Sequence, residues 1–315
     1  MAKRSKRMKR LEPAVLTVTT TTPPVASGAT GQFTCDLSQM ASLINRRFYR
    51  QGLNWMVGGF KFITVPNAQG QITVQKLPNT WVTSGAWNKT MNAWNDQQLE
   101  AIEDMGGESG LAAFRDYKVY ADATHLAAGY GSNLLPQDGA GAAYAPGEWE
   151  PSQIVIPNDG APGATVEYFV QMVGPSAGTA KGAIAGYEFS RAYPQDPDPQ
   201  TPAMQTSWLN RMNDVGDNND DIVDNAINRN DSLPYPQAGY PGGGAQAPTL
   251  QFHDITGVRG TTIGGVSRAK GGNFPCGLVR IIYTNQADAA QAVTIQIDLV
   301  PGTHRGYMAE PMQEM

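Results

Sequence analysis

The chain has 315 residues, of which 41% are apolar and 16% are charged, with 35 Gly and 22 Pro. Gly and Pro stay below the share typical of a low-complexity chain, so we expect the sequence to bury a core. No run of 18 apolar residues occurs, which excludes a membrane-spanning helix. The two cysteines, Cys35 and Cys276, are too few for a disulfide framework or a four-thiolate metal site, and we expect buried free thiols.

The formal net charge of −5 is unevenly distributed, because residues 1–10 hold six of the 23 basic residues and no acidic one. A block of like charges without apolar partners predicts a disordered arm that binds nucleic acid without sequence preference. A nuclear-localisation signal and a solubilising tail are alternative interpretations. No apolar stretch follows the arm, so we expect no secretory signal. The candidate nucleic-acid-binding residues are Lys3, Arg4, Lys6, Arg7, Lys9 and Arg10.

The first elements after the arm are a strand and an amphipathic helix. The segment Ala14–Thr22 is dense in Val and Thr and predicts a strand. Asp36 is a good N-cap with Gln39 as its capping-box partner, and the apolar spacing that follows predicts a helix over 37–50, ended by Gly52. The last turn of this predicted helix holds three arginines, Arg46, Arg47 and Arg50. They are interpreted either as favourable charges at a helix C-terminus or as part of an inward-facing basic surface.

Alternating apolar residues then predict several strands. Residues 53–65 alternate with a change of phase at Gly58-Gly59, which indicates a bulge. Turn residues at 66–70 and a second alternating run at 72–75 predict a hairpin. The same pattern predicts half-buried antiparallel strands in three later segments, 166–172, 278–283 and 293–299.

Long loops and two further helices fill the remainder of the prediction. The Gly- and Pro-rich loops are Pro136–Gly163, Pro194–Pro202 and Pro234–Pro248. Helical spacing indicates a helix over 207–228, interrupted near Gly216, and another over 88–104. Strands outnumber helices, so we expect a mainly β fold, either a jelly roll or a sandwich.

No motif predicts catalysis or a bound cofactor. The nearest match to a nucleophile elbow fails at Leu111, and neither a Walker pattern nor a zinc-protease helix occurs. The acidic cluster 217–221 lacks the Gly and Glu of a calcium loop, and a solvated acidic turn is its default interpretation. We therefore expect that the protein is not an enzyme and holds no cofactor or metal. We expect three tryptophans to pack in the core or in an interface and not to stack on bases; they are Trp81, Trp87 and Trp94.

Four strings resemble those of a known family of viral proteins. They are Asp36–Gln39, Asn45–Gly52, Leu77–Trp81 and Val300–Ala309, and together they are similar to the capsid proteins of small circular Rep-encoding single-stranded DNA viruses, in the divergent group from faecal and environmental samples. The resemblance implies a single jelly-roll shell domain, an antiparallel β-sandwich with long loops and one to three short helices. It places this domain at 14–315, behind a disordered basic arm at 1–13.

The same resemblance implies a function and a set of partners. The protein would assemble with itself into an icosahedral shell and package a single-stranded DNA genome through its arm. It would be found in the virion, with the host nucleus as a site of assembly and a host glycan or receptor as a further partner. Two alternatives from the residues remain: a single-strand-binding protein that never assembles, and a carbohydrate-binding β-sandwich.

Overall fold

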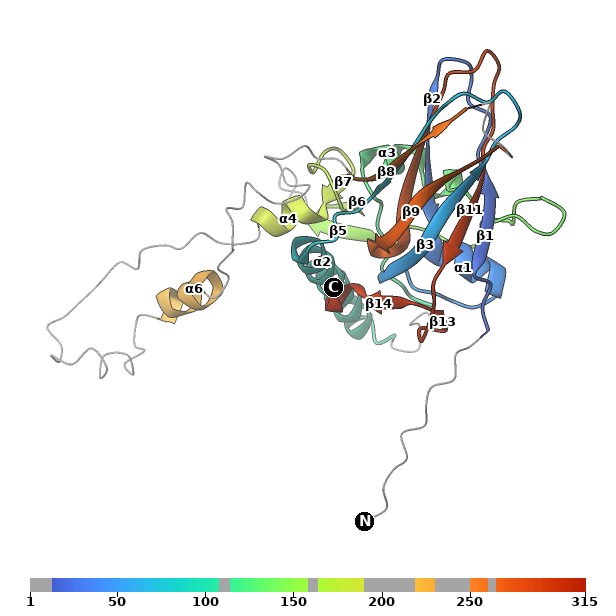
Figure 1. Cartoon of the computed structure of the whole chain (residues 1–315). Helices are drawn as coiled ribbons and strands as arrows, with labels where there is room; N and C mark the ends of the chain where they lie inside the picture. The colour runs from blue at the N-terminus through green and yellow to red at the C-terminus, as the bar shows by residue number, and fades with distance from the viewer. Residues whose placement is uncertain (1–12, 108–113, 158–163, 190–218, 230–249, 260–264) are drawn as a thin grey trace, which may run out of the picture.

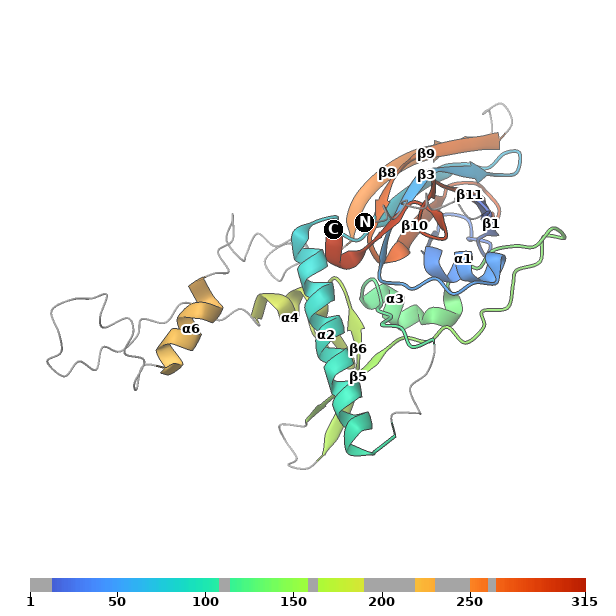
Figure 2. The same cartoon turned by 90° about the horizontal axis from the view of Figure 1, so that it is seen from below.

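The computed structural model describes residues 13–107, 114–157, 164–189, 219–229, 250–259 and 265–315. The described chain is mainly β, with antiparallel sheets that curl into a half-barrel (Figures 1 and 2). The arm residues Lys3, Arg4, Lys6, Arg7, Lys9 and Arg10 lie outside the described residues. No described helix is long and apolar enough to cross a membrane.

One sheet interleaves strands from both ends of the chain. The strand β11 pairs with β1 on one side and with β3 on the other, and β3 also pairs with β9 and, at its start, with β14. Their bounds are Thr17–Thr21 for β1, Leu53–Ile63 for β3, Val266–Phe274 for β9, Thr294–Leu299 for β11 and Ala309–Pro311 for β14. The predicted strand at 14–22 is thereby confirmed in a shorter form.

The second sheet places β10 between two partners. The strand β10 pairs with β2 and β4, and β4 pairs with β8, all antiparallel. Their bounds are Thr30–Asp36 for β2, Gly70–Lys76 for β4, Gln251–Val258 for β8 and Leu278–Asn285 for β10. A short pair, β12 (Pro301–Gly302) and β13 (Gly306–Tyr307), follows β11.

The main core lies between these sheets and follows the predicted alternation. Along β11, Ile295, Ile297 and Leu299 are buried while the residues between them are half-buried. The bulge predicted at Gly58-Gly59 is confirmed, because Asp298 pairs with Gly59 and Leu299 with Val57, so the register shifts around Gly58. Cys35 and Cys276 are buried and free, as predicted.

Asp36 begins the helix α1 (Leu37–Asn45) as predicted, but the helix ends earlier than predicted. The Asp36 carboxylate accepts hydrogen bonds from the N–H groups of Ser38 and Gln39. Arg46 then takes a left-handed conformation with φ of 54°, which turns the chain out of the helix. The prediction of a helix to residue 50 is therefore wrong, and no basic residue lies in the last turn of α1.

A large insertion lies between β4 and β8 and forms a second buried cluster. The helix α2 packs against α4, and the cluster also takes in buried residues of β6 and the C-terminal Met312. The remaining bounds are α2 Trp81–Asp104, α3 Ala123–Ala128, β5 Gln153–Pro157, β6 Thr165–Gln171, β7 Ala180–Gly182, α4 Ala183–Phe189, α6 Asn219–Arg229 and the short 3₁₀ turns Tyr130–Ser132, Pro275–Gly277 and Met312–Glu314.

The predicted hairpin of 53–65 with 72–75 is wrong. Both strands form, but β3 belongs to one sheet and β4 to the other. The turn between them connects the two sheets, and Ala68 within it is buried. Alternation identifies a strand with one buried face, and it does not identify the partner of that strand.

Other boundaries also differ from the predictions. The predicted loop 136–163 contains β5, and β6 runs antiparallel to β5 but parallel to β7. The helix predicted at 88–104 forms and begins earlier, at Trp81, so it is not a short helix. The predicted loops 194–202 and 234–248 lie outside the described residues, as does the predicted helix up to residue 218.

Candidate nucleic-acid interface

The chain enters the body beside the C-terminal end of α1. The N–H of Val15 donates a hydrogen bond of 3.1 Å to Asn45 Oδ1, and the Val15 carbonyl accepts one of 2.6 Å from the Tyr307 hydroxyl. Asn45 Nδ2 in turn lies 2.7 Å from that hydroxyl. These contacts place the first described residues of the chain, from residue 13 onward, next to the end of α1.

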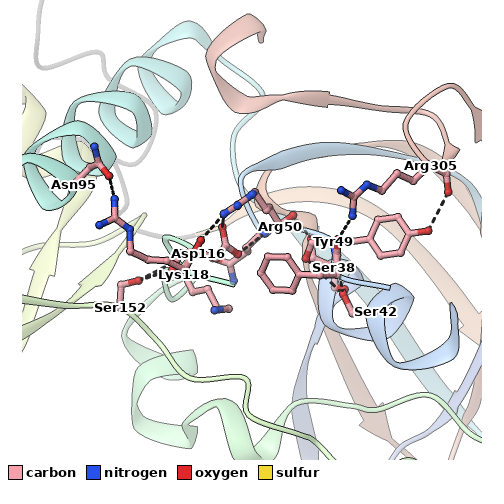
Figure 3. A network of polar contacts seen from close by, with 12 residues as sticks. Ser38, Ser42, Tyr49, Arg50, Asn95, Asp116, Lys118, Ser152 and Arg305 are labelled. Atoms are coloured by element: carbon pink, nitrogen blue, oxygen red, sulfur yellow. Dashed lines mark hydrogen bonds and ion pairs between the residues drawn. The ribbon is translucent and has the colours of Figure 1, made fainter. Parts of the chain in front are cut away.

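A hollow of about 820 Å³ lies in the same region and combines arginines with aromatic rings. We call it the arginine–aromatic hollow. It is formed by the segment after α1, by α2, by residues 114–117 and by the turn at 304–305, and several of its polar side chains are drawn in Figure 3. The residues that define it are Phe48, Arg50, Trp94, Phe114, Arg115 and Arg305.

The aromatic rings of the hollow offer flat apolar faces near its opening. The Phe48 and Phe114 rings are 5.3 Å apart in an edge-to-face arrangement, and Phe114 is 70% exposed. Trp94 packs against Tyr117 with centroids 5.5 Å apart, while its own position stays half-buried. An exposed phenylalanine in a hollow that a tryptophan also lines is the kind of surface on which single-stranded bases stack.

Each arginine is held by contacts that leave positive charge in the hollow. Arg50 donates to the carbonyl oxygen of Arg115 and lies 3.6 Å from Asp116, yet its side chain is 56% exposed (Figure 3). Arg115 donates to Asn95 Oδ1, and its guanidinium lies 5.2 Å from the centre of the Trp94 ring.

Arg305 closes the other end of the hollow. Its Nη1 donates to the Phe48 carbonyl at 2.5 Å, and its own carbonyl accepts from the Tyr49 hydroxyl at 2.9 Å (Figure 3). Arg305 itself is exposed. The contacts join the turn near the C-terminus to the segment after α1, so guanidinium groups far apart in sequence share one surface.

Asp116 is the acidic residue that lines the hollow. Burial raises the pKa of the Asp116 carboxyl, and the Gln51 N–H, Lys118 and Arg50 oppose that rise. Gln51 N donates to Asp116 Oδ2 at 3.0 Å, and the Ser152 hydroxyl, which donates to the Asp116 carbonyl, positions the same segment. One carboxylate and three guanidinium groups line the hollow, so it keeps a positive balance.

Two buried N–H groups at the hollow have no hydrogen-bond acceptor among the described residues. They belong to Arg115 (Nη1) and Trp87 (Nε1), and Trp87 is only 5% exposed. A buried donor without an acceptor costs about 1–3 kcal/mol, more for a charged group.

The structure divides the predicted site residues between several places. Of the three tryptophans, Trp87 and Trp94 both line the hollow, Trp87 also packs in the core against Tyr117, and Trp81 is 37% exposed. Of the three arginines after α1, Arg50 lines the hollow and the Arg46 guanidinium lies 5.4 Å from the centre of the Tyr144 ring.

Sequence reasoning missed Arg115, Arg305 and Phe114. Nothing in the spacing around residue 115 marks it. Arg305 lies in the string 300–309 and Phe48 in the string 45–52, and these strings meet in space, since Tyr49 and Tyr307 have ring centres 5.4 Å apart. Shared distinctive strings at the two ends of the chain are the one signal that could have brought these residues together.

The search for a metal site and the comparisons with known proteins give no further information on this surface. Within the described ranges, no group of three or more His, Cys, Asp or Glu residues could hold a metal ion. Of the acidic cluster 217–221, only Asn219–Asp221 are described, at the start of α6. No protein-family model, curated protein or solved structure matches the chain.

Proposed function

We propose that this protein is the coat protein of a small single-stranded DNA virus. Copies of the body form a closed icosahedral shell, and the basic arm together with the arginine–aromatic hollow faces the packaged DNA. In this proposal the protein is a structural component of the virion and carries out no catalysis.

The order of strand pairing carries the proposal. Numbered along the chain, the eight long strands of the two sheets are β1, β2, β3, β4, β8, β9, β10 and β11. The first of these pairs with the eighth, the second with the seventh, the third with the sixth and the fourth with the fifth. This nested pairing is what one long hairpin folded into two sheets would give, so it supports a jelly roll, an architecture that viral capsid proteins use.

The fold alone does not select this function, because lectins and cupins share jelly-roll architecture. The charge of the arm distinguishes a coat protein from these. Six basic residues precede Leu11 in the sequence, and the described chain begins next to the end of α1, where Val15 contacts Asn45 and Tyr307. Positive charge with stacking rings on one side of an otherwise acidic subunit supports a shell with a nucleic-acid-facing inner surface.

The direct test is negative-stain electron microscopy and light scattering of the purified chain. Uniform particles of megadalton mass that protect DNA from nuclease are expected. Monomers or dimers that bind single strands would instead establish a non-assembling binding protein. Selective binding on a glycan array without nucleic-acid retention would establish a carbohydrate-binding protein, and either result would overturn the proposal.

A further inference from the structure

A second hollow lies on the insertion, shares Trp94 with the arginine–aromatic hollow, and is mainly apolar. Its volume is about 390 Å³, and we call it the α2–β5 groove. One face of α2, the strand β5 and the helix α4 form its walls. The residues used below are Lys89, Ala93, Trp94, Gln97, Ile154 and Lys181.

The groove is fixed by hydrogen bonds between its walls. The Gln97 side chain binds both backbone groups of Val155, donating to the carbonyl at 2.6 Å and accepting from the N–H at 3.2 Å. A glutamine amide thus satisfies the edge of β5 as a neighbouring strand would. The groove is therefore formed before any ligand arrives, which lowers the cost of binding.

The helix α6 has an apolar face without a partner in the described chain. Ile222 is 46% exposed and Val223 is 54% exposed, and both views show α6 set apart from the sheets (Figures 1 and 2). An isolated helix of 11 residues is marginal in water, so packing against another surface must stabilise it. The groove is an apolar surface suited to receive these side chains.

The charges of the two surfaces are complementary. The acidic residues Asp220, Asp221 and Asp224 lie on α6, while Lys89 and Lys181 line the groove. The ammonium groups are held in place, since Lys89 Nζ lies 5.9 Å from the centre of the Tyr187 ring and Lys181 Nζ lies 4.1 Å from that of Tyr168. Opposite charges around an apolar contact set orientation and exclude other partners.

We infer that α6 of one copy packs into the α2–β5 groove of a second copy. Ile222 and Val223 then cover Trp94 and Ile154, and the acidic side chains of α6 face the two lysines. Residues 190–218 separate α4 from α6, a length that spans on the order of 100 Å when extended. Among the described residues of the single chain, none covers the groove or the apolar face of α6, although α4, where this connection begins, is itself a wall of the groove.

The inference needs only two copies and is independent of a closed shell or bound DNA. Because each copy carries both the helix and the groove, the contact repeats from subunit to subunit. It can be measured on unassembled subunits, so failure to form shells would leave the measurement valid.

Cysteine cross-linking between two differently sized chains tests this contact. One chain carries Val223→Cys and the other Ala93→Cys, an exposed position inside the groove, while the native Cys35 and Cys276 are buried. Under mild oxidation we expect a disulfide-linked dimer with one chain of each size. The matched control carries Asn92→Cys, which is exposed on α2 but does not line the groove, and should give at least tenfold less dimer.

The opposite results would overturn the inference. Equal dimer formation with Asn92→Cys, or none with Ala93→Cys, excludes this seating of α6. A chain carrying both Val223→Cys and Ala93→Cys that cross-links only within itself at every dilution assigns α6 to its own groove and contradicts exchange between copies.

Charge reversal gives a second, independent measurement. The double change Asp220→Lys with Asp224→Lys should lower the yield of the mixed dimer about tenfold. Changing Lys89→Asp and Lys181→Asp in the groove chain should restore it, because the attraction is then rebuilt with reversed signs. Loss without restoration would contradict the charge pairing and, with it, the proposed orientation of the helix.

Discussion

The ring of Trp87 lies directly over Gly52, so closely that a Cβ on Gly52 would be 2.3 Å from Trp87 Cζ2. The sequence predicts Gly52 as a helix stop, whereas its role in the structure is to admit this ring. The contact joins the start of β3 to α2 and therefore holds the insertion on the sheets beside the arginine–aromatic hollow.

Gly52→Ala should therefore destabilise the subunit by about 1–3 kcal/mol, the usual cost of overpacking a close contact. Urea unfolding of the unassembled subunit measures the change as a lower midpoint. Gly257→Ala is the matched control, because a Cβ there meets nothing within 4 Å, and it should be neutral or slightly stabilising. Equal midpoints for the two variants would contradict the packing role of Gly52.

The dependence of stability on pH should change when Asp36 is replaced. Burial raises the pKa of the Asp36 carboxyl to about 6, against hydrogen bonds from Gln51, Trp149, Gln39 and Ser38. Because the pKa of this carboxyl is higher in the folded than in the unfolded chain, the group stabilises the fold. This stabilisation is fully present below the unfolded pKa near 4 and is lost as the pH rises through 6. The resulting change in the free energy of unfolding is about 3 kcal/mol, at roughly 1.4 kcal/mol for each pKa unit.

His125 acts in the opposite direction. Burial lowers the pKa of its imidazole to about 4, so it contributes stability that is present above the unfolded pKa near 6.5 and is lost as the pH falls through 4. We expect Asp36→Asn to make the subunit lose more stability on acidification from pH 7 to 4.5 than the unchanged chain does, and His125→Gln to make it lose less. Urea unfolding at several pH values measures both slopes. Parallel profiles for all three chains would refute this assignment.

These buried groups also show how far sequence reasoning extends. Asp36 as an N-cap, the bulge at Gly58 and the alternation of β11 follow from local chemistry, and all three are confirmed. Local chemistry does not identify partners across the core. The sequence therefore predicts a hairpin of β3 and β4, although the two strands lie in different sheets. The strand β8 was missed because most of its residues are exposed or half-buried, so it carries no clear alternation.

The candidate site was predicted less completely than the fold, for a related reason. Its arginines come from three distant parts of the sequence, and each is held by a group that no spacing rule connects to it. Arg115 contacts Asn95 on α2, and Arg305 contacts the Phe48 carbonyl. Of these three arginines, the sequence indicates only Arg50 as a candidate, because it stands in a cluster of basic residues after a recognisable helix.

The exposed ring of Phe114 should contribute to binding of single-stranded DNA. Phe114→Ala removes one stacking face and should weaken binding of a short oligothymidine about 5- to 150-fold, equivalent to about 1–3 kcal/mol for one stacked base. Fluorescence anisotropy with a chain beginning at Leu11 isolates the hollow from the arm. Met105→Ala, which changes an 85% exposed apolar residue, is the control and should leave affinity unchanged. Similar losses in both variants would remove the hollow from DNA binding.

The basic arm should determine the salt dependence of DNA binding. Six cations that each meet one phosphate of a single strand steepen the plot of log K against log salt by about 4 units, at roughly 0.7 per phosphate. A chain beginning at Leu11 should therefore show a slope shallower by that amount, measured by anisotropy between low and physiological salt. Exchanging the arm lysines and arginines for one another keeps the charge and should keep the full slope. An unchanged slope after removal of residues 1–10 would show that the arm does not meet the phosphates, and packaging would then have to rest on the body.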